Sequence, residues 1–500
     1  MANDLGPQDT ANALWALERL RALDLELLAA LGGQALRSLR LLRPAGLAAV
    51  LTALARACRG VPPERWPPVV PRLVGAVAGE VPALVAPGRC GHAEFAQVCW
   101  AFATLAHTEP ATYERLAAAG AAIGWGVLQP RDLGTVAWSF ATAGTATEPF
   151  MRAVAAASVP AVSQFDPQGV ANLCWAFAAS RAESSGELFA AVCPHAAEAA
   201  KAGAYSARQL SNISWAFASS ACLDDELMES VALQSCRHIR EFRGAELGAL
   251  VWSFATVSAG GCHAAALAEA AAKELVASPG APDASWTARE VANTVWALAV
   301  LDHHSGAAVR HAAGVLSRAR QAGEALDMHL GQWYFAWLGL TLLRAAGPEA
   351  LAAGAVDPAW VQECQGSAKK QAVLQHAEPG LWGPVSAMSR LHRDVGAELR
   401  RLVGADTLVE DEYVIHHCLV VDLVLPTLGI ALEVDGPGHF AHRLRPSAGQ
   451  DALQQRGASR LKRRLLRQLG WDVRAVRWLE WDSLRSASQK RDHLRAVVLD

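Results

Sequence analysis

A seven-residue motif centred on tryptophan recurs along the first two-thirds of the chain and constrains its fold more than any other feature. Six well-kept copies read QVCWAFA, TVAWSFA, NLCWAFA, NISWAFA, ALVWSFA and NTVWALA, and their tryptophans are Trp100, Trp138, Trp175, Trp215, Trp252 and Trp296. Successive tryptophans are 37–44 residues apart. A period near ~40 residues is the signature of stacked helical hairpins. The sequence therefore predicts a mostly α protein, with a right-handed α-solenoid of two-helix repeats over residues 1–345.

The residues before each motif explain why it forms a helix. Asp166, Ser206 and Thr287 stand nine residues before their tryptophans and are good helix N-caps, because a short polar side chain accepts a hydrogen bond from the first turn. Gln209 and Glu290 follow three residues after their caps and complete two capping boxes. We therefore expect the first helix of each repeat to begin just after this cap, and a second amphipathic helix to follow it.

The tryptophans and the asparagines of the motif each allow two interpretations. A tryptophan here packs against the next repeat or offers a flat aromatic surface, and we favour packing because Ile213 and Phe217 extend one apolar stripe with Trp215. The asparagines three residues earlier satisfy backbone groups of the neighbouring repeat or line the concave face, and we favour the first role. They are Asn12, Asn172, Asn212 and Asn293.

Composition excludes several classes of protein. The chain has 500 residues, of which 52% are hydrophobic and 19% charged, so it is folded and too long for one core. Its formal net charge is −3, so any surface that binds a polyanion must be local. No run of about 18 apolar residues predicts a transmembrane helix. The chain opens MANDLGPQDT without a signal peptide or an arginine-rich presequence, and we expect an N-terminally incomplete sequence because a repeat is already under way.

The ten cysteines predict thiols in a reducing compartment and no disulfide framework. The sequence contains no CxxC pair and no Cys/His cluster at zinc-ligand spacing. Cys99 and Cys174 directly precede motif tryptophans, where a small buried side chain is expected. The cysteines therefore predict packing rather than chemistry.

The pattern changes after residue 345. Residues 346–410 carry glycine, proline and scattered charge and are interpreted as a connector, and residues 411–500 as a separate domain. The expected elements of that domain are strands at Cys418–Pro426 and Gly429–Phe440, a basic helix at Ser459–Gly470, and a strand turning into a helix at Trp471–Leu484. Strand, strand, helix and strand predict a small α/β domain.

These segments carry a resemblance to a known family. The run VDLVLP, GIALEVDGPGHF, GASRLKRRLLRQLGWDV and WLEW, within Ile415–Leu484, resembles a RAP domain. The repeats before it resemble the octotricopeptide-type and heptatricopeptide-type helical arrays of organellar RNA proteins, and FAST-kinase-like mitochondrial RNA proteins share this layout. The resemblance implies RNA binding and a role in transcript processing, stability or ribosomal RNA maturation, in the mitochondrial matrix or the chloroplast. It also implies a restriction-endonuclease-like fold for the C-terminal domain.

That fold raises the question of catalysis. Asp422 and Glu433 stand where the superfamily places two metal-binding carboxylates, which would hold Mg²⁺ and activate water. The superfamily usually has lysine two residues after the glutamate, where this chain has Asp435, and His439 follows four residues later. This departure weakens the nuclease interpretation. We therefore expect no enzyme and no required cofactor, with a metal-dependent endoribonuclease that uses Asp422, Glu433, Asp435, His439 and Mg²⁺ as the alternative.

The basic helix is the favoured RNA-binding element of the C-terminal domain. Several positive charges without interleaved glutamate suit contacts with phosphate groups. Leu461, Leu465 and Leu469 are expected to form the buried stripe of this helix. The residues expected to contact RNA are Arg460, Lys462, Arg463, Arg464 and Arg467.

Three functions follow from these features. The favoured one is an RNA-binding protein whose repeats bind single-stranded organellar RNA while the C-terminal domain contacts phosphates, with ribonucleoprotein components as further partners and no membrane insertion. The second is an RNA endonuclease, and the third is a protein–protein scaffold within a ribonucleoprotein complex. Salt-dependent RNA binding distinguishes the first from the third, and Mg²⁺-dependent cleavage distinguishes the second from both.

Overall fold

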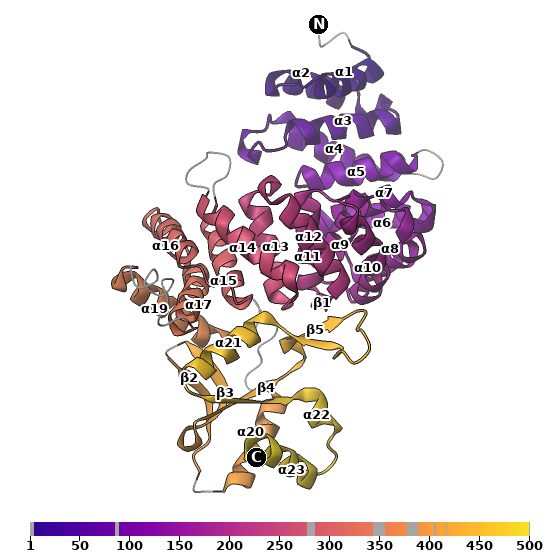
Figure 1. Cartoon of the computed structure of the whole chain (residues 1–500). Helices are drawn as coiled ribbons and strands as arrows, with labels where there is room; N and C mark the ends of the chain where they lie inside the picture. The colour runs from indigo at the N-terminus through magenta and orange to yellow at the C-terminus, as the bar shows by residue number, and fades with distance from the viewer. Residues whose placement is uncertain are drawn as a thin grey trace. The chain divides into compact units, whose positions relative to one another are not determined.

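The computed structural model describes residues 5–85, 90–277, 286–343, 356–377, 389–404, 407–416 and 418–499. The chain divides into two compact units, Met1–Tyr205 and Ser206–Asp500, which are called the N-terminal unit and the C-terminal unit below. Both contain paired helices, and the C-terminal unit also contains two small β-sheets (Figure 1). The predicted fold class, mostly α with a small C-terminal α/β domain, is confirmed.

The N-terminal unit is a two-layered stack of helix pairs. The first helices of the pairs, α1, α3, α5, α7 and α9, pack against one another in chain order, and the second helices α2, α4 and α6 do the same in their own layer. The helices are α1 (Pro7–Arg19), α2 (Leu25–Arg37), α3 (Pro44–Ala57), α4 (Val69–Leu84), α5 (His92–Thr104), α6 (Pro110–Ile123), α7 (Pro130–Thr142), α8 (Glu148–Ser158), α9 (Pro167–Ser180) and α10 (Ser185–Lys201).

The repeats of the C-terminal unit follow the same plan. α11, α13, α15 and α17 pack in order, and α12, α14 and α16 form the second layer. The helices are α11 (Ala207–Ser219), α12 (Asp225–Arg237), α13 (Gly244–Thr256), α14 (Cys262–Ala277), α15 (Ala288–Val300), α16 (Gly306–Gln321) and α17 (Asp327–Leu343), followed by α19 (Pro358–Ala377) against α17. Each unit therefore contains an array in which a repeat buries its apolar face against its neighbours.

The predicted helix starts are confirmed by their capping bonds. The Asp166 carboxylate accepts a hydrogen bond from the Gly169 backbone N–H at 2.7 Å. Ser206 and Gln209 form a reciprocal capping box, as do Thr287 and Glu290. These bonds satisfy backbone donors that the first turn of a helix otherwise leaves without partners.

A left-handed residue ends the first helix of seven repeats, six positions after the tryptophan. In six of these repeats the N–H of the next residue bonds back to the carbonyl two residues after the tryptophan, as from His107 to Phe102 and from Ala259 to Phe254, both at 2.9 Å. This geometry resembles the Schellman cap of helix C-termini, which usually uses glycine. The positive-φ residues are Arg21, Ala106, Gly144, Arg181, Ala221, Ser258 and Asp302. Six of the seven carry a side chain, so the sequence pattern gave no sign of this cap.

Phenylalanine, rather than tryptophan, fills the core of the motif. The phenylalanines two residues after the tryptophan are at most 1% exposed, and they are Phe102, Phe140, Phe177, Phe217 and Phe254. The tryptophans at 100, 138, 175, 215 and 252 are only half-buried, whereas Trp296 is buried. The rings of Trp138 and Trp175 lie 6.3 Å apart, so these two tryptophans of adjacent repeats pack together while part of each side chain stays exposed. Cys99 and Cys174 are fully buried, as expected, and all ten cysteines are free.

A four-stranded sheet forms the centre of the C-terminal α/β domain. Its strand order is β2-β3-β4-β7, with β2, β3 and β4 antiparallel and β7 parallel to β4. The elements are α20 (Arg390–Val403), β2 (Glu410–Ile415), β3 (Leu419–Leu425), β4 (Ile430–Asp435), β5 (Phe440–Arg443), β6 (Leu453–Gln455), α21 (Gly457–Gln468), β7 (Asp472–Arg477), α22 (Trp478–Ser483) and α23 (Ala487–Val498). The predicted strand, strand, helix and strand are thus present as β3, β4, α21 and β7.

The core of this domain begins before the predicted start at residue 411. Val395 and Leu399 of α20 are fully buried with Leu432 of β4, Trp481 of α22 and Leu494 of α23. The stretch interpreted as a connector therefore contains helix α20, which covers one face of the sheet together with α23. The sequence analysis did not predict this helix, because four of its residues are arginine and the segment is polar on average although one face is apolar.

The α/β domain is joined to the repeats of its own unit by a shared sheet and by α21. Strand β1 (Cys222–Leu223), which follows α11, pairs in parallel with β5, and β5 pairs with β6. Arg445, just beyond β5, binds the buried Asp224 carboxylate through two hydrogen bonds of 2.6 and 2.7 Å. α21 packs against α13, α15 and α17 and against β7, and it lies between repeats and sheet in Figure 1.

Gly457, at the start of α21, sets how closely this helix approaches the repeats. A Cβ atom there would lie 1.9 Å from the Ala255 carbonyl oxygen and 2.5 Å from a Val300 methyl group. We expect Gly457→Ala to lower the free energy of unfolding by about 1–3 kcal/mol, because backbone must move to admit the methyl group. Gly366→Ala, in α19 with no atom within 4 Å of the new Cβ, is the matched control and should gain about 0.5–1 kcal/mol. Urea unfolding of both variants measures this, and equal effects would contradict the tight approach.

Candidate nucleic-acid interface

The basic helix α21 lies against the acidic residues of strand β4. Lys462 Nζ lies 2.7 Å from Glu433 Oε2, and the Arg463 guanidinium pairs with the Asp435 carboxylate. The two carboxylates are 2% and 1% exposed, whereas the Lys462 and Arg463 side chains retain 25% and 16% exposure. Two of the five residues expected to contact RNA therefore neutralise buried carboxylates of the same domain.

Burial dominates the protonation of this group. Removal from water raises the pKa of Glu433 to about 7, against the opposing effect of the Lys462 ammonium. Burial alone would lower the pKa of Lys462, but the nearby Glu433 and Asp422 carboxylates raise it above its usual value. Lys462 therefore stays charged, and its attraction offsets part of the cost of a buried Glu433 carboxylate.

The remaining predicted catalytic residues surround the same pair. Asp422 Oδ2 accepts a hydrogen bond from the Val434 backbone N–H at 2.7 Å. His439 Nδ1 lies 3.3 Å from Asp435 Oδ1 and 3.2 Å from Ser459 Oγ, and burial lowers the pKa of its imidazole. The structure thus brings all four predicted residues, Asp422, Glu433, Asp435 and His439, to one end of the sheet.

This site fits a divalent cation only in part. Glu433 Oε1 is buried without a hydrogen-bond partner, which is what a carboxylate oxygen awaiting a cation would show. Among the described residues, however, the acidic side chains of β3 and β4 do not form a group of three whose ligand atoms lie within 4.8 Å of one another. Lys462 and Arg463 also already neutralise the Glu433 and Asp435 carboxylates, as Mg²⁺ would do. Asp422 and Glu433 are the residues that would bind the ion.

The other three basic residues of α21 differ in exposure. Arg464 donates to the Ala299 carbonyl oxygen and lies 3.4 Å from Asp302, so it ties α21 to the repeat that contains α15. Arg460 and Arg467 are exposed. Leu461 and Leu465 are buried as expected, but Leu466 is buried in place of Leu469, which is half-buried. The exposed positive surface of α21 is therefore smaller than the sequence suggested.

The repeats of the C-terminal unit carry an open hollow between α11 and α13. Its volume is about 590 Å³, and it is lined by Arg208, Asn212, Arg243, Glu241 and Glu246 among others. Asn212 is one of the four motif asparagines and reaches this surface. The other three accept hydrogen bonds from nearby glutamines, such as Asn293 from Gln332 at 2.9 Å. All three bonds join side chains, and those of Asn12 and Asn172 lie within a single helix, so they do not show the favoured role of satisfying backbone groups of the neighbouring repeat.

Comparison with known families concerns the C-terminal domain. Residues 432–497 match the family model described as the RAP domain. A RAP domain is present in this chain. The matched segment covers most of β4, all of β5, β6, α21, β7 and α22, and nearly all of α23, and it includes the Glu433–Lys462 pair. The resemblance drawn from the sequence motifs is confirmed for this segment, and a helical repeat array precedes it.

Among curated proteins, the chain is similar to a RAP domain-containing protein, chloroplastic, of Oryza sativa subsp. japonica. The two are 31% identical over 78 residues, which is 16% of this chain and 11% of the rice protein. The chain therefore matches about a tenth of the length of that relative. A chain from a homology model of the full-length AP-3 complex in an intermediate open conformation is 13% identical, with 73% of this chain and 64% of that chain covered. Its TM-score is 0.25, which is too low to indicate a shared fold.

No helix in the described part of the chain combines the length and the apolar character that crossing a bilayer requires.

Several contacts that position the RAP domain were not predicted from the sequence. The main ones are the ion pairs of Arg443 and Arg445 with Asp225 and Asp224 at the start of α12. Their only sequence signal is two arginines beyond a glycine-rich turn, and no local pattern shows that acceptors lie more than 200 residues away.

The Glu433–Lys462 pair should be a main determinant of RAP-domain stability. We expect Lys462→Met to cost about 3 kcal/mol of unfolding free energy, because it leaves the Glu433 carboxylate buried and unpaired. The double variant Glu433→Leu with Lys462→Met should recover most of that loss, since no unpaired charge remains. Arg467→Met on the same helix is the control and should change stability by less than about 0.5 kcal/mol. Thermal and urea unfolding provide the measurement, and a Lys462 variant as stable as the control would contradict the pairing.

Proposed function

We propose that this protein binds single-stranded RNA in organellar RNA metabolism, with the repeats holding the strand and the RAP domain contacting its phosphates. The observation that carries the proposal is the RAP domain at residues 432–497, attached to an array of helical repeats. The chloroplastic description of the rice relative favours an organellar place of action. Transcript processing, transcript stability and ribosomal RNA maturation are the steps that such a protein would serve.

Two surfaces support this proposal by their chemistry. Arg460 and Arg467 on α21 are exposed cations that suit phosphate contacts. The hollow between α11 and α13 presents Asn212, whose amide both donates and accepts hydrogen bonds and so suits the edge of an unpaired base. The half-buried tryptophans offer aromatic edges along the same helices. The proposal therefore assigns charge contacts to the RAP domain and base contacts to the repeats.

Salt titration separates these two kinds of contact. We expect the full chain to bind a pool of labelled single-stranded organellar RNA, with an affinity that falls as salt rises. The double variant Arg460→Gln, Arg467→Gln should weaken binding and reduce the log–log salt slope by about 1.4, because each lost phosphate contact on a single strand removes about 0.7. Asn212→Ala should weaken binding by about 1 kcal/mol and leave that slope unchanged, because it removes no charge.

The matched control is Arg495→Gln, which removes an exposed charge from α23 on the opposite side of the sheet from α21. It should bind RNA as the wild type does. If all three variants change affinity and slope alike, binding reflects the overall charge rather than these surfaces. Absence of RNA binding at low salt would leave the protein–protein scaffold as the function to pursue.

The Glu433–Lys462 contact favours RNA cleavage as a second candidate. The sequence lacks the lysine expected two residues after Glu433, yet Lys462 Nζ reaches the same carboxylate from α21. Asp422 and Glu433 would hold Mg²⁺, which would supply an activated water, while Lys462 would steady charge on a phosphate oxygen. Such a protein would cut the strand that its repeats select.

Cleavage can be tested apart from binding. If the second candidate is correct, Mg²⁺ should start cleavage of bound RNA and EDTA should stop it. Asp422→Asn should abolish cleavage and preserve binding, because the amide oxygen can still accept the Val434 hydrogen bond while the negative charge is lost. Asp482→Asn, an exposed acidic residue on α22, serves as the control. Intact RNA at every Mg²⁺ concentration would reject the nuclease candidate and leave the binding proposal untouched.

A further inference from the structure

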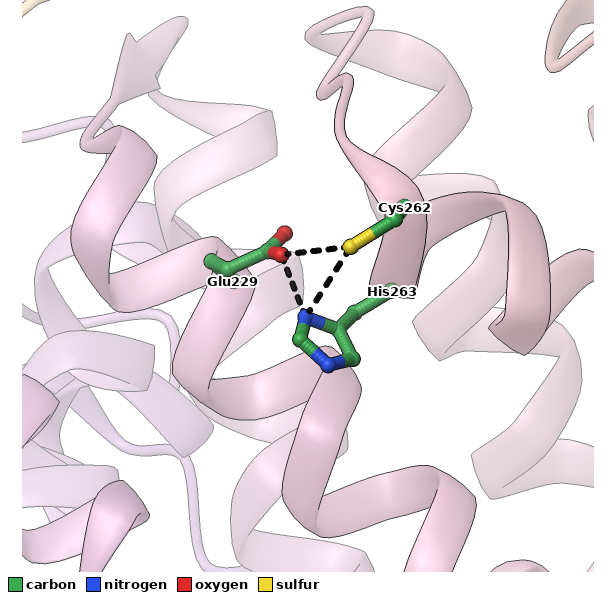
Figure 2. A group of neighbouring side chains, drawn as sticks. All are labelled: Glu229, Cys262 and His263. Carbon is green, nitrogen blue, oxygen red and sulfur yellow. Dashed lines mark hydrogen bonds and ion pairs between the residues drawn. The ribbon is translucent and has the colours of Figure 1, made fainter.

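A cysteine, a histidine and a glutamate meet on the second-layer helices of two adjacent repeats. Glu229 lies in α12, and Cys262 and His263 are the first two residues of α14, which packs against α12. Figure 2 shows the three side chains converging on one point. Cys262 Sγ lies 3.6 Å from Glu229 Oε1 and 3.7 Å from His263 Nδ1, and that imidazole nitrogen is in hydrogen-bond contact with the same carboxylate oxygen.

The spacing of these atoms matches the edges of a metal coordination shell. With a Zn–S bond of about 2.3 Å and Zn–N or Zn–O bonds of about 2.0 Å, tetrahedral geometry places sulfur about 3.5 Å from either other ligand. Both observed sulfur distances agree with that value. The histidine nitrogen and the carboxylate oxygen lie closer together, in hydrogen-bond contact. A bound cation would replace that hydrogen bond and separate the two atoms slightly.

Gly261 makes room for the carboxylate in this cluster. A Cβ atom at this position would lie 2.6 Å from Glu229 Oε2, and the backbone has a φ of +104°, which favours glycine. The adjacent Gly260 has no atom within 4 Å of the equivalent position. The loop before α14 is thus shaped so that Glu229 can lie over the start of that helix beside Cys262.

We propose that Glu229, Cys262 and His263 bind a divalent cation of the zinc class and that the ion joins α12 to α14. Thiolate and imidazole ligands select zinc over the hard cations Mg²⁺ and Ca²⁺. Three protein ligands on an accessible surface leave the fourth position to water, as Cys262 is exposed and the other two side chains are 36–37% exposed. Cys262 is also the exposed member of the ten cysteines, most of which are buried.

The bound ion links two repeats close to the RAP-domain contact. Glu229 follows Asp225 and Glu226 by one helical turn of α12, and those two residues receive Arg443 and Arg445 of the RAP domain. An ion that fixes α12 against α14 therefore steadies the helix to which the RAP hairpin binds. Because only the folded chain brings the three ligands together, zinc must raise the unfolding temperature.

The test is metal binding by the full chain, purified without a polyhistidine tag and stripped with a chelator. We expect one Zn²⁺ per chain beyond any background, a higher unfolding temperature with Zn²⁺, and a sulfur-to-metal charge-transfer band with Co²⁺ as probe. Cys262→Ala and His263→Ala should each lower the affinity by about tenfold or more, since loss even of a supporting residue around a metal has that effect. Cys236→Ala, a half-buried cysteine of α12 away from the cluster, should retain all three signals.

The glycine pair provides a test that leaves every ligand in place. Gly261→Ala should displace Glu229 and weaken Zn²⁺ binding, whereas Gly260→Ala should bind as the wild type does. Circular dichroism without metal checks that each variant is folded. Equal Zn²⁺ affinity in Cys262→Ala and wild type, or a Co²⁺ spectrum without the sulfur band, would overturn the proposal. Either result would leave the cluster as a histidine–glutamate ion pair beside a free thiol.

Discussion

The packing of α21 between the repeats and the RAP sheet is the contact on which the rest of the C-terminal unit depends. On one side, Gly457 brings the helix against the backbone of α13 and a side chain of α15. On the other side, Lys462 and Arg463 reach the carboxylates of β4. A shift of this helix would expose apolar surface and separate two buried ion pairs at once. The RAP domain and the last repeats therefore form one folded body. The packing of α21 also fixes the position of every candidate RNA contact on that helix.

The charges of α21 have a double role because of this placement. A run of lysine and arginine on an isolated helix is solvated and available to phosphate groups. Here the central residues of the run serve as counter-ions for Glu433 and Asp435, and Arg464 binds the repeat layer. Only the outer positions, such as Arg460 and Arg467, remain for a ligand. A basic helix can thus be a structural requirement first and a binding surface second.

Local patterns predicted the repeats well, and long-range contacts explain what they missed. Capping residues and a period near 40 residues placed the helices, because both act within a few turns of chain. The buried role of Phe177 in place of Trp175, the left-handed cap at Arg181 and the pairing of β1 with β5 depend on neighbours that no local window contains. The carboxylates of the RAP domain were identified through the family resemblance, whereas the contact of Lys462 with Glu433 comes from a separate helix and was not predicted. The cluster of Cys262 and His263 with Glu229 could not be predicted either, because Glu229 lies 33 residues earlier, on a different helix.

The left-handed residue that ends the first helix in seven repeats bears on how these arrays respond to mechanical strain. An α-solenoid is elastic because small rotations at each repeat interface add up along the stack. The left-handed caps fix the turn that leaves the first helix of each repeat, so we expect such rotations to fall mainly on the interfaces between repeats. In the C-terminal unit, the RAP domain contacts three successive first-layer helices through α21 and removes those interfaces from the motion. Under a pulling force on that unit, the repeats that contain α13, α15 and α17 would resist deformation. The unit would stretch at the repeat interfaces that the RAP domain does not bridge.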